Sequence, residues 1–309
     1  MRARDALSQI AVRLLGGAMV TVALLSLAVP AAAQDKVWRV GLLSNGVSAP
    51  AGQQSTWRSG VLLSLDQEGY RLGLNLELVE RYSEGHVDRL PGLAAEIADA
   101  GVDVAVAVSE VSVRAMLAAT QATPIVMVGG DPVAGGFVAS MARPGGRVTG
   151  LAFQTAEGDV KRLQLLREAM PDTRRFGRLG PPGQVNAHAV ELLADAAKRF
   201  DIELTMRQVA RLEPTEYAAA LIAMRGEGVA SVLIASTQAW AGDTPTVGRI
   251  ALEHGLPTIC EWAFQARTGC VLAYGHDLAY SQRRAGWYAA RILKGAAPAD
   301  LPVEQPDAW

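Results

Sequence analysis

The sequence VMVGGDPVAGGF, residues 126–137, decides the fold class that the rest of the chain supports. An apolar run ends in two glycines, and Asp131 and Pro132 follow at once. A short apolar run of this kind is typical of a strand covered on both faces of a parallel sheet. In open parallel α/β sheets, ligands bind beyond the carboxyl ends of the strands. The stretch therefore predicts a parallel sheet whose strand ends carry a ligand site.

Strand-like and helix-like segments alternate on both sides of this stretch. The order strand, helix, strand implies parallel sheets with helices on both faces and right-handed crossovers. The predicted strands lie at 37–45, 74–82, 102–109, 123–130 and 147–153, and then at 202–209, 229–236, 256–262 and 269–275. The predicted helices include 87–100, 112–121, 133–141, 159–170, 187–200, 214–225 and 246–254.

The alternation restarts after residue 158 and predicts two α/β lobes, each a parallel sheet flanked by helices, with a ligand cleft between them. We expect lobe 1 to span 37–152 and lobe 2 to span 153–275. A helix at about 278–296 returns to lobe 1, and 297–309 form a C-terminal tail.

The first 33 residues have the composition of a secretory signal peptide. Three arginines lie in the first 13 residues, an uncharged apolar run of about 16 residues follows, and an A-x-A site closes the segment. The alternative is a membrane anchor, but the run is shorter than the roughly 20 residues that a bilayer span needs. We expect cleavage after Ala33, export, and a periplasmic mature protein.

Composition excludes several classes of function. The net charge is −2 with acids and bases well mixed, so nucleic acid is not an expected partner. The four histidines are scattered, and no zinc, P-loop, dinucleotide or nucleophile-elbow motif is present. We expect no metal, no cofactor and no catalytic activity.

Two cysteines, Cys260 and Cys270, lie at the ends of neighbouring apolar segments. In an oxidising compartment they could pair. Because disulfide geometry is restrictive, we favour two separate buried thiols, with a bridge as the open alternative.

Small, polar or acidic residues follow the predicted strands, and these are the candidate ligand contacts. They are Ser44, Asn45, Ser109, Glu110, Asp131, Pro132, Thr237, Glu261 and Tyr274.

Asp131 has two compatible interpretations. Its carboxylate can pair with a ligand cation such as an ammonium group, while Gly129 and Gly130 let the backbone approach the ligand closely. Alternatively, Pro132 opens a helix at 133–141 and Asp131 is only its N-cap.

The other candidates also have structural alternatives. Glu110 can anchor a ligand, but a negative charge at a helix N-terminus is the more ordinary reason for it. Tyr274 can stack on a ligand or pack between the lobes. Trp240 and Trp262 follow strand ends and could form an apolar wall, although buried aromatic residues more often belong to a core.

Several blocks of the sequence resemble the ABC-transporter substrate-binding family of periplasmic proteins. These are VGLLS, HVDRLPGLAAEIA, TPIVMVGGDPVAGGFVASMARPGGRVTGL, KRLQLLREAMP and YGHDLAYSQRRAGWYAARILKGAAPADLPVEQP. The resemblance covers the whole mature chain, and the GDPV and ADLPVEQP blocks are specific to the family.

The resemblance implies a bilobal fold that closes on a small ligand and docks on a membrane permease, as a monomer. The best-studied members of the family bind aromatic amino acids such as tryptophan. The aspartate of the family's DPV motif matches Asp131, and Ser109 and Tyr274 match positions that line the cleft.

Three features depart from the family pattern. TRRFGRLGPPGQ stands where the family has an apolar strand, so the first strand of lobe 2 is in doubt. Glu110 stands near positions where small or hydroxyl residues are usual. The family chain normally continues beyond VEQP through a further strand and helix that return to lobe 2, so the sequence predicts a shortened C-terminus.

The sequence thus predicts a solute-binding protein of an ABC-type uptake system that binds an amino acid or a related compound. The alternatives are a periplasmic ligand sensor for a membrane signalling protein, an enzyme on the same scaffold, or a degenerate copy that binds nothing.

Overall fold

The computed structural model describes residues 36–49, 55–153, 155–181, 187–237 and 242–306. The predicted signal peptide, 1–33, lies outside these residues, and so does Trp240. Among the helices of the described part, none is both long and apolar enough to cross a membrane.

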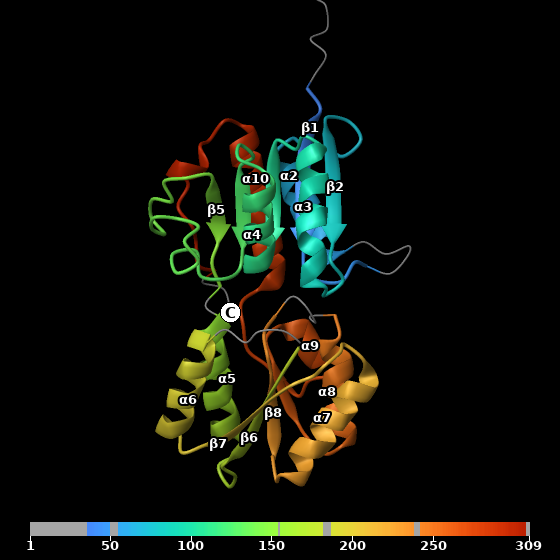
Figure 1. Cartoon of the computed structure of the whole chain (residues 1–309), viewed down its shortest axis with the longest axis vertical. Coiled ribbons are helices and arrows are strands. Elements are labelled where there is room, and N and C mark those ends of the chain that lie inside the picture. Colours follow the sequence, from blue (N-terminus) through green and yellow to red (C-terminus); the bar gives the residue numbers. More distant parts are fainter. Residues whose placement is uncertain (1–35, 50–54, 154, 182–186, 238–241, 307–309) are drawn as a thin grey trace, which may run out of the picture. The chain divides into compact units, whose positions relative to one another are not determined.

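The first sheet is parallel and has the strand order β2-β1-β3-β4-β5 (Figure 1). Its strands are β1 (Trp38–Ser44), β2 (Leu76–Tyr82), β3 (Val104–Val108), β4 (Ile125–Val128) and β5 (Val148–Leu151). The helices between them are α2 (Thr56–Gln67), the short η1 (Val87–Arg89), α3 (Leu90–Asp99) and α4 (Glu110–Ala119). Because all five strands are parallel, their carboxyl ends lie along one edge of the sheet.

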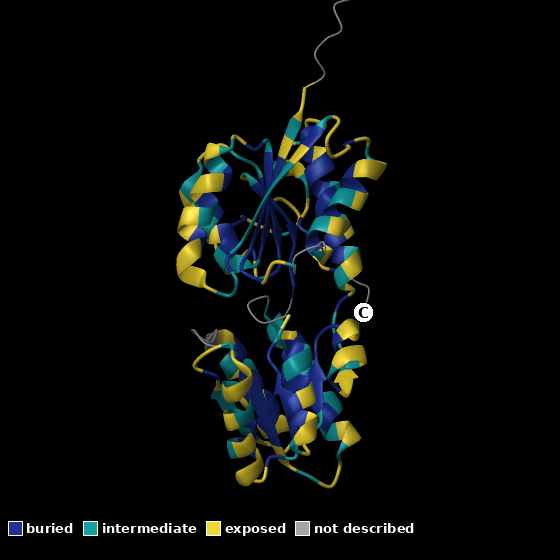
Figure 2. Ribbon diagram, turned by 90° about the vertical axis from the view of Figure 1, so that its right-hand side faces the viewer, coloured by how far each residue is buried: buried dark blue, intermediate teal, exposed yellow. Residues whose placement is uncertain are grey.

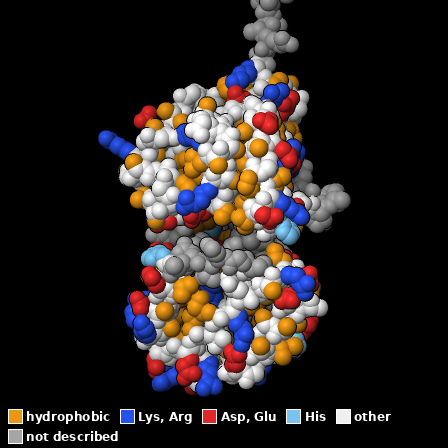
Figure 3. Space-filling model, in the orientation of Figure 1, with side chains coloured by type: hydrophobic (Ala, Val, Ile, Leu, Met, Phe, Trp, Pro, Cys, Tyr) orange, Lys and Arg blue, Asp and Glu red, His pale blue; other side chains and the backbone are white. Residues whose placement is uncertain are grey.

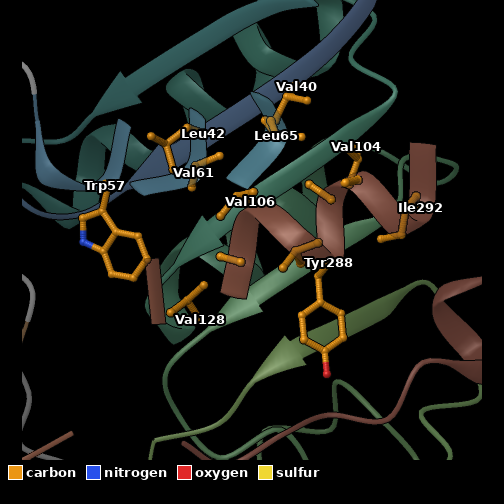
Figure 4. Close-up of a cluster of buried hydrophobic side chains, with 14 of the residues drawn as sticks. Val40, Leu42, Trp57, Val61, Leu65, Val104, Val106, Val128, Tyr288 and Ile292 are labelled. Atoms are coloured by element: carbon orange, nitrogen blue, oxygen red, sulfur yellow. The ribbon is translucent and has the colours of Figure 1, made fainter. Parts of the chain in front are cut away.

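Both faces of this sheet are buried, which explains the continuous apolar runs in the sequence (Figure 2). In β3, Val104 and Val106 pack with side chains of α2 and of a late helix, α10 (Leu278–Leu293) (Figure 4). Ala105 and Ala107, on the opposite face, pack with side chains of α3 and α4. The alternation follows from the two-residue period of a strand.

The C-terminal part of the chain returns to the first sheet. After α10 and the short η3 (Pro298–Asp300), Glu304 pairs with Leu151 at the outer edge of β5. The Glu304 N–H donates to the Gly150 carbonyl at 2.9 Å, and its carboxylate binds the guanidinium of Arg284 on α10, with 2.8 Å from Nε to Oε2. Glu304 therefore adds an isolated β-bridge to the edge of the first sheet.

The second sheet is also parallel, in the order β10-β9-β8-β6-β7. Its strands are β6 (Arg175–Gly180), β7 (Glu203–Gln208), β8 (Ser231–Ile234), β9 (Thr258–Cys260) and β10 (Leu272–Ala273). Its helices are α5 (Thr155–Ala169), α6 (Ala187–Arg199), α7 (Pro214–Gly226), α8 (Thr244–Glu253) and α9 (Ala263–Thr268). The predicted fold class, two α/β lobes each with a parallel sheet flanked by helices, is confirmed.

The strand that the arginines of TRRFGRLG put in doubt does form. It is β6, the neighbour of β8 in the second sheet, and five of its six residues are buried. Phe176 and Leu179 enter the two apolar clusters on the opposite faces of the sheet. The buried Arg178 has a carboxylate partner, described below.

The helix predicted at 133–141 is wrong. The hydrogen bonds after Asp131 close a single turn, in which the Gly135 N–H donates to the Asp131 carbonyl and the Phe137 N–H to the Pro132 carbonyl. Gly136 then has a φ of +71°, which ends the turn. Phe137 packs in the core beside α4. We infer that this burial favours the turn over a helix at these residues.

The interpretation of Cys260 and Cys270 as separate thiols is also wrong. They form a disulfide, with their Cα atoms 6.2 Å apart. Cys260 ends β9 and Cys270 lies just before β10, its neighbour in the sheet, so strand pairing brings the two backbones to bridging distance.

Gly150 in β5 provides a test of the first sheet. Its φ is +132°, and a Cβ there would overlap the backbone of Met127 on β4. We expect Gly150→Ala to lower the free energy of unfolding by about 2 kcal/mol or more, measured by urea denaturation. The exposed Gly92 in α3 has open space around it, and Gly92→Ala should leave stability unchanged or raise it by up to about 1 kcal/mol. Equal effects of the two changes would contradict this account of β5.

Candidate functional site

Residues of both sheets line one pocket with a volume of about 170 Å³. The lining residues follow the carboxyl ends of β3, β4, β5, β8 and β9, as the strand-end argument predicts. They are Ser109, Glu110, Val128, Gly129, Gly130, Phe153, Thr155, Ser236, Thr237, Glu261 and Trp262.

Ser109 lies between β3 and α4 in an unusual backbone conformation. Its φ is +91° and its ψ is 155°, a region that is essentially restricted to glycine. Its Oγ caps α4 by accepting from the Ser112 N–H at 3.4 Å. Strain of this size persists where the surrounding structure enforces it, and it is concentrated at ligand sites.

Glu110 begins α4 and lies beside the glycines that end β4. A Cβ on Gly130 would come 3.1 Å from the Glu110 Cβ and 3.5 Å from its Oε2. Gly129 and Gly130 have φ values of +92° and +82°, so this turn needs glycine twice. The Glu110 side chain is 36% exposed and pairs with Arg114, with 2.8 Å from Nη2 to Oε1.

The second wall of the pocket comes from the residues after β9. Glu261 and Trp262 follow Cys260 directly and therefore lie inside the ring that the disulfide closes. The Trp262 N–H donates to Gln265 Oε1 at 2.9 Å, which fixes the start of α9. Gly275 lies against the backbone of Glu261, where a Cβ would not fit. These contacts hold the wall in one position.

Glu261 is a buried carboxylate next to His276. His276 Nδ1 is 3.2 Å from Glu261 Oε1, and the His276 ring lies over the Phe153 ring with 3.8 Å between centroids. Burial acts to raise the pKa of Glu261, but the hydrogen bond from His276 and the charge of Arg162 outweigh it and hold the pKa below its ordinary value. Glu261 is therefore a charged acceptor at neutral pH.

A buried ion network lies behind this wall. Arg162 on α5 is 1% exposed and donates from Nη2 to Asp159 Oδ1 and to Ser236 Oγ, both at 2.6 Å. Its Nη1 donates to the Tyr274 carbonyl at 2.7 Å. Arg178 on β6 donates from Nε to Asp159 Oδ2 at 3.3 Å. Asp159 thus pairs with two arginines, and Arg162 connects the residues that follow β8 and β10.

Four of the nine predicted contacts line the pocket: Ser109, Glu110, Thr237 and Glu261. The other five lie outside its lining. Ser44 and Asn45 are buried after β1, where Ser44 Oγ accepts from the Gly46 N–H at 3.1 Å. The Tyr274 side chain packs on the apolar cluster that contains Phe176 and Leu233.

Asp131 and Pro132 also lie outside the pocket lining. Asp131 is exposed, and its Oδ1 accepts from the N–H groups of Val133 and Ala134 at 3.0 and 2.9 Å. It caps a turn, as in the second interpretation above, although no helix follows. Its predicted contact with a ligand stays a prediction.

Sequence reasoning missed Phe153, Thr155 and the ion network, and gave Trp262 only as a possible wall. Phe153 is the last residue of the predicted strand 147–153 and the first residue of the predicted lobe 2, and this position between two lobes was the available signal. Asp159 and Arg162 lie on the same helical face as Leu163 and Leu166, and charges on an apolar face indicate a buried pair.

Within the described residues, no group of three or more His, Cys, Asp or Glu side chains is placed to hold a metal ion. Acidic and basic side chains are interspersed on the face that Figure 3 shows.

The pocket and the two parallel sheets define a binding protein for a small molecule, and comparison with known proteins gives its family. The family described as ABC transporter substrate binding protein matches residues 44–308. The chain therefore belongs to the ABC transporter substrate binding protein family.

The individual relatives have low sequence identity to this chain. The tyrosine-binding protein of Clostridioides difficile (strain R20291) is 25% identical over 248 residues, which are 80% of this chain and 70% of that protein. A crystal structure from Streptococcus pneumoniae, an ABC domain in complex with L-Trp, shares the fold with a TM-score of 0.74 at 22% identity, over 87% of this chain and 88% of that one. A conserved domain protein of Vibrio cholerae has a TM-score of 0.77 at 23% identity, over 88% and 90%.

The ion network predicts a large effect of one charge-removing change. Asp159→Asn leaves Arg162 and Arg178 buried without a carboxylate, so we expect the free energy of unfolding to fall by about 3–5 kcal/mol in urea denaturation. Glu253→Gln, which breaks the exposed pair with Arg249, should cost no more than about 0.5 kcal/mol. A small loss for Asp159→Asn would mean that the network contributes little.

The lowered pKa of Glu261 predicts a pH dependence of stability. A carboxyl group whose folded-state pKa is below its unfolded value stabilises the protein above the unfolded value, about 4.3, and loses that contribution as pH falls through the folded value. We expect the unfolding free energy to fall below about pH 4.3, and Glu261→Gln to be less stable at neutral pH with a shallower fall. Parallel curves for the two proteins would contradict this.

Proposed function

We propose that the protein is the exported receptor of an ABC-type uptake system and binds an amino acid or a related compound in the strand-end pocket. The observation that carries the proposal is the composition of that pocket. Hydroxyl groups, two carboxylates, an aromatic wall and the backbone of two glycines converge there from two sheets. The similarity to a tyrosine-binding protein and to a structure in complex with L-Trp supports this class.

Each part of such a ligand has a partner among these residues. The hydroxyls of Ser109, Thr155 and Thr237 suit a ligand carboxylate. The carboxylates of Glu110 and Glu261 suit an ammonium group. Phe153 and Trp262 suit an apolar or aromatic side chain. Binding then stabilises the conformation in which both sheets contact the ligand at once.

Location and partners complete the proposal. The sequence of 1–33 supports export to the periplasm, and the Cys260–Cys270 disulfide suits an oxidising compartment. Family membership supports a membrane permease as the partner of the loaded protein. We propose that the receptor acts as a monomer and has no catalytic activity.

A thermal-shift screen of the purified protein against amino acids, amines and organic acids tests the function. A ligand that binds the folded state raises the melting temperature with its saturation. A shift for one class supports the proposal. A cooperative melt that no compound shifts, at concentrations up to several millimolar, would overturn it.

Ser109→Gly separates stability from binding. Glycine adopts the φ of +91° without strain and is a tolerable N-cap, so the unfolding free energy should stay within about 1 kcal/mol of the original or rise. Loss of Oγ should weaken binding of the ligand found in the screen about tenfold, measured by titration calorimetry. An unchanged Kd would remove the Ser109 hydroxyl from the set of ligand contacts.

A further inference from the structure

The charged side chains among the described residues that line the pocket are both acidic. Among the described residues that line it, the charged side chains are Glu110 and Glu261, and no lysine, arginine or histidine is among them. We propose that the pocket selects ligands that carry a net positive charge, such as basic amino acids or small amines, and that Glu110 sets this preference. The inference rests on the proposed function, because it names the ligand class of the same pocket.

The arginines close to the pocket do not oppose this selection. Arg162 and His276 line a smaller cavity that shares Phe153 and Glu261 with the pocket, and Arg178 lies on β6. Asp159 and Glu261 balance the positive charges of the two arginines. The Nη atoms of Arg162 donate hydrogen bonds to Asp159, to Ser236 and to the Tyr274 carbonyl. The network therefore keeps Glu261 ionised without adding a cation to the pocket lining.

Glu110 has an oxygen to offer. Both hydrogen bonds from Arg114, from Nε at 3.3 Å and from Nη2 at 2.8 Å, end on Oε1. Oε2 accepts none from the described residues and lies on the side of Gly130, which lines the pocket. The pair with Arg114 is half-exposed, and water screens such a pair strongly. A ligand cation that excludes water from Oε2 can therefore pair with Glu110 with little competition from Arg114.

The aromatic side chains favour the same charge. Phe153 and Trp262 both line the pocket, and the face of an aromatic ring attracts ammonium and guanidinium groups. The charge of Glu261 is balanced inside the network, so Glu110 is the lining carboxylate that remains for a ligand cation. A basic amino acid or a diamine brings a second positive group that can pair with Glu110.

A panel of defined compounds tests the inference on the purified mature receptor, residues 34–309. L-lysine, L-arginine and cadaverine represent cations, L-leucine, L-tyrosine and L-tryptophan represent zwitterions, and succinate represents anions. We expect the cations to raise the melting temperature most, with the Kd then measured by calorimetry. Raising the salt concentration from about 20 to 300 mM should weaken their binding, because it shortens the Debye length.

Glu110→Gln is the decisive variant. It keeps the shape of the side chain and should weaken binding of the tightest cation at least tenfold while reducing the salt dependence. Glu253→Gln is the matched control, because Glu253 forms the same exposed i,i+4 pair, with Arg249 at 2.8 Å, on α8 away from the pocket. Melting curves of both variants without ligand confirm that each is folded under the assay conditions.

The outcomes separate the inference from the proposed function. Tight binding of cations that Glu110→Gln weakens and Glu253→Gln does not would support the inference. Shifts only with zwitterions or succinate would overturn the inference and leave the receptor function standing. Cation binding that is equal in Glu110→Gln and the original would exclude Glu110 as the selecting residue. No shift with any compound would overturn the receptor function as well.

Discussion

The buried carboxylate of Asp159 is the constraint on which the second sheet and its part of the pocket depend. Two arginines, one on α5 and one on β6, meet its two oxygens. Removing either arginine's charge from water is costly, and only a partner with good geometry offsets that cost. Asp159 therefore allows an arginine-bearing strand to be the inner neighbour of β8, although the resemblance had led us to expect apolar residues there.

The same network reaches the ligand-facing edge of the sheet. Arg162 binds Ser236 at the end of β8 and the Tyr274 carbonyl after β10, so two strand ends are held by one guanidinium. The planar fork of arginine suits this task, since it presents several donors in fixed directions. Gly158 keeps room for the fork, because a Cβ there would come 3.3 Å from both Nη atoms. The position of the pocket wall is thus a consequence of charge pairing inside the lobe.

The fold followed from the sequence because the signals for it are local. Alternating segments of strand and helix period, with continuous apolar strands such as VAVAV in β3, allow few arrangements other than parallel sheets. The prediction was wrong where local and tertiary signals compete. At 133–141 the pair Asp131 and Pro132 indicated the start of a helix, but Gly135, Gly136 and the burial of Phe137 produced a turn. The disulfide could not be predicted from spacing, since pairing depends on the register of β9 and β10.

The pocket lies at strand ends that the sequence singled out, and contact with a ligand there stays a prediction. Several polar residues at the strand ends serve the backbone: Ser44 and Asp131 accept hydrogen bonds from N–H groups of their own turns. Sequence patterns cannot separate a turn cap from a ligand contact, because both need a short polar side chain after a strand. Two of the residues that line the pocket, Ser109 and Glu261, share a different property, which is that they violate local preferences. Ser109 has a backbone conformation suited to glycine, and Glu261 is a buried charge. Each is unfavourable by itself and is held by its surroundings, and such conflicts between local preference and global structure are expected at sites shaped for binding.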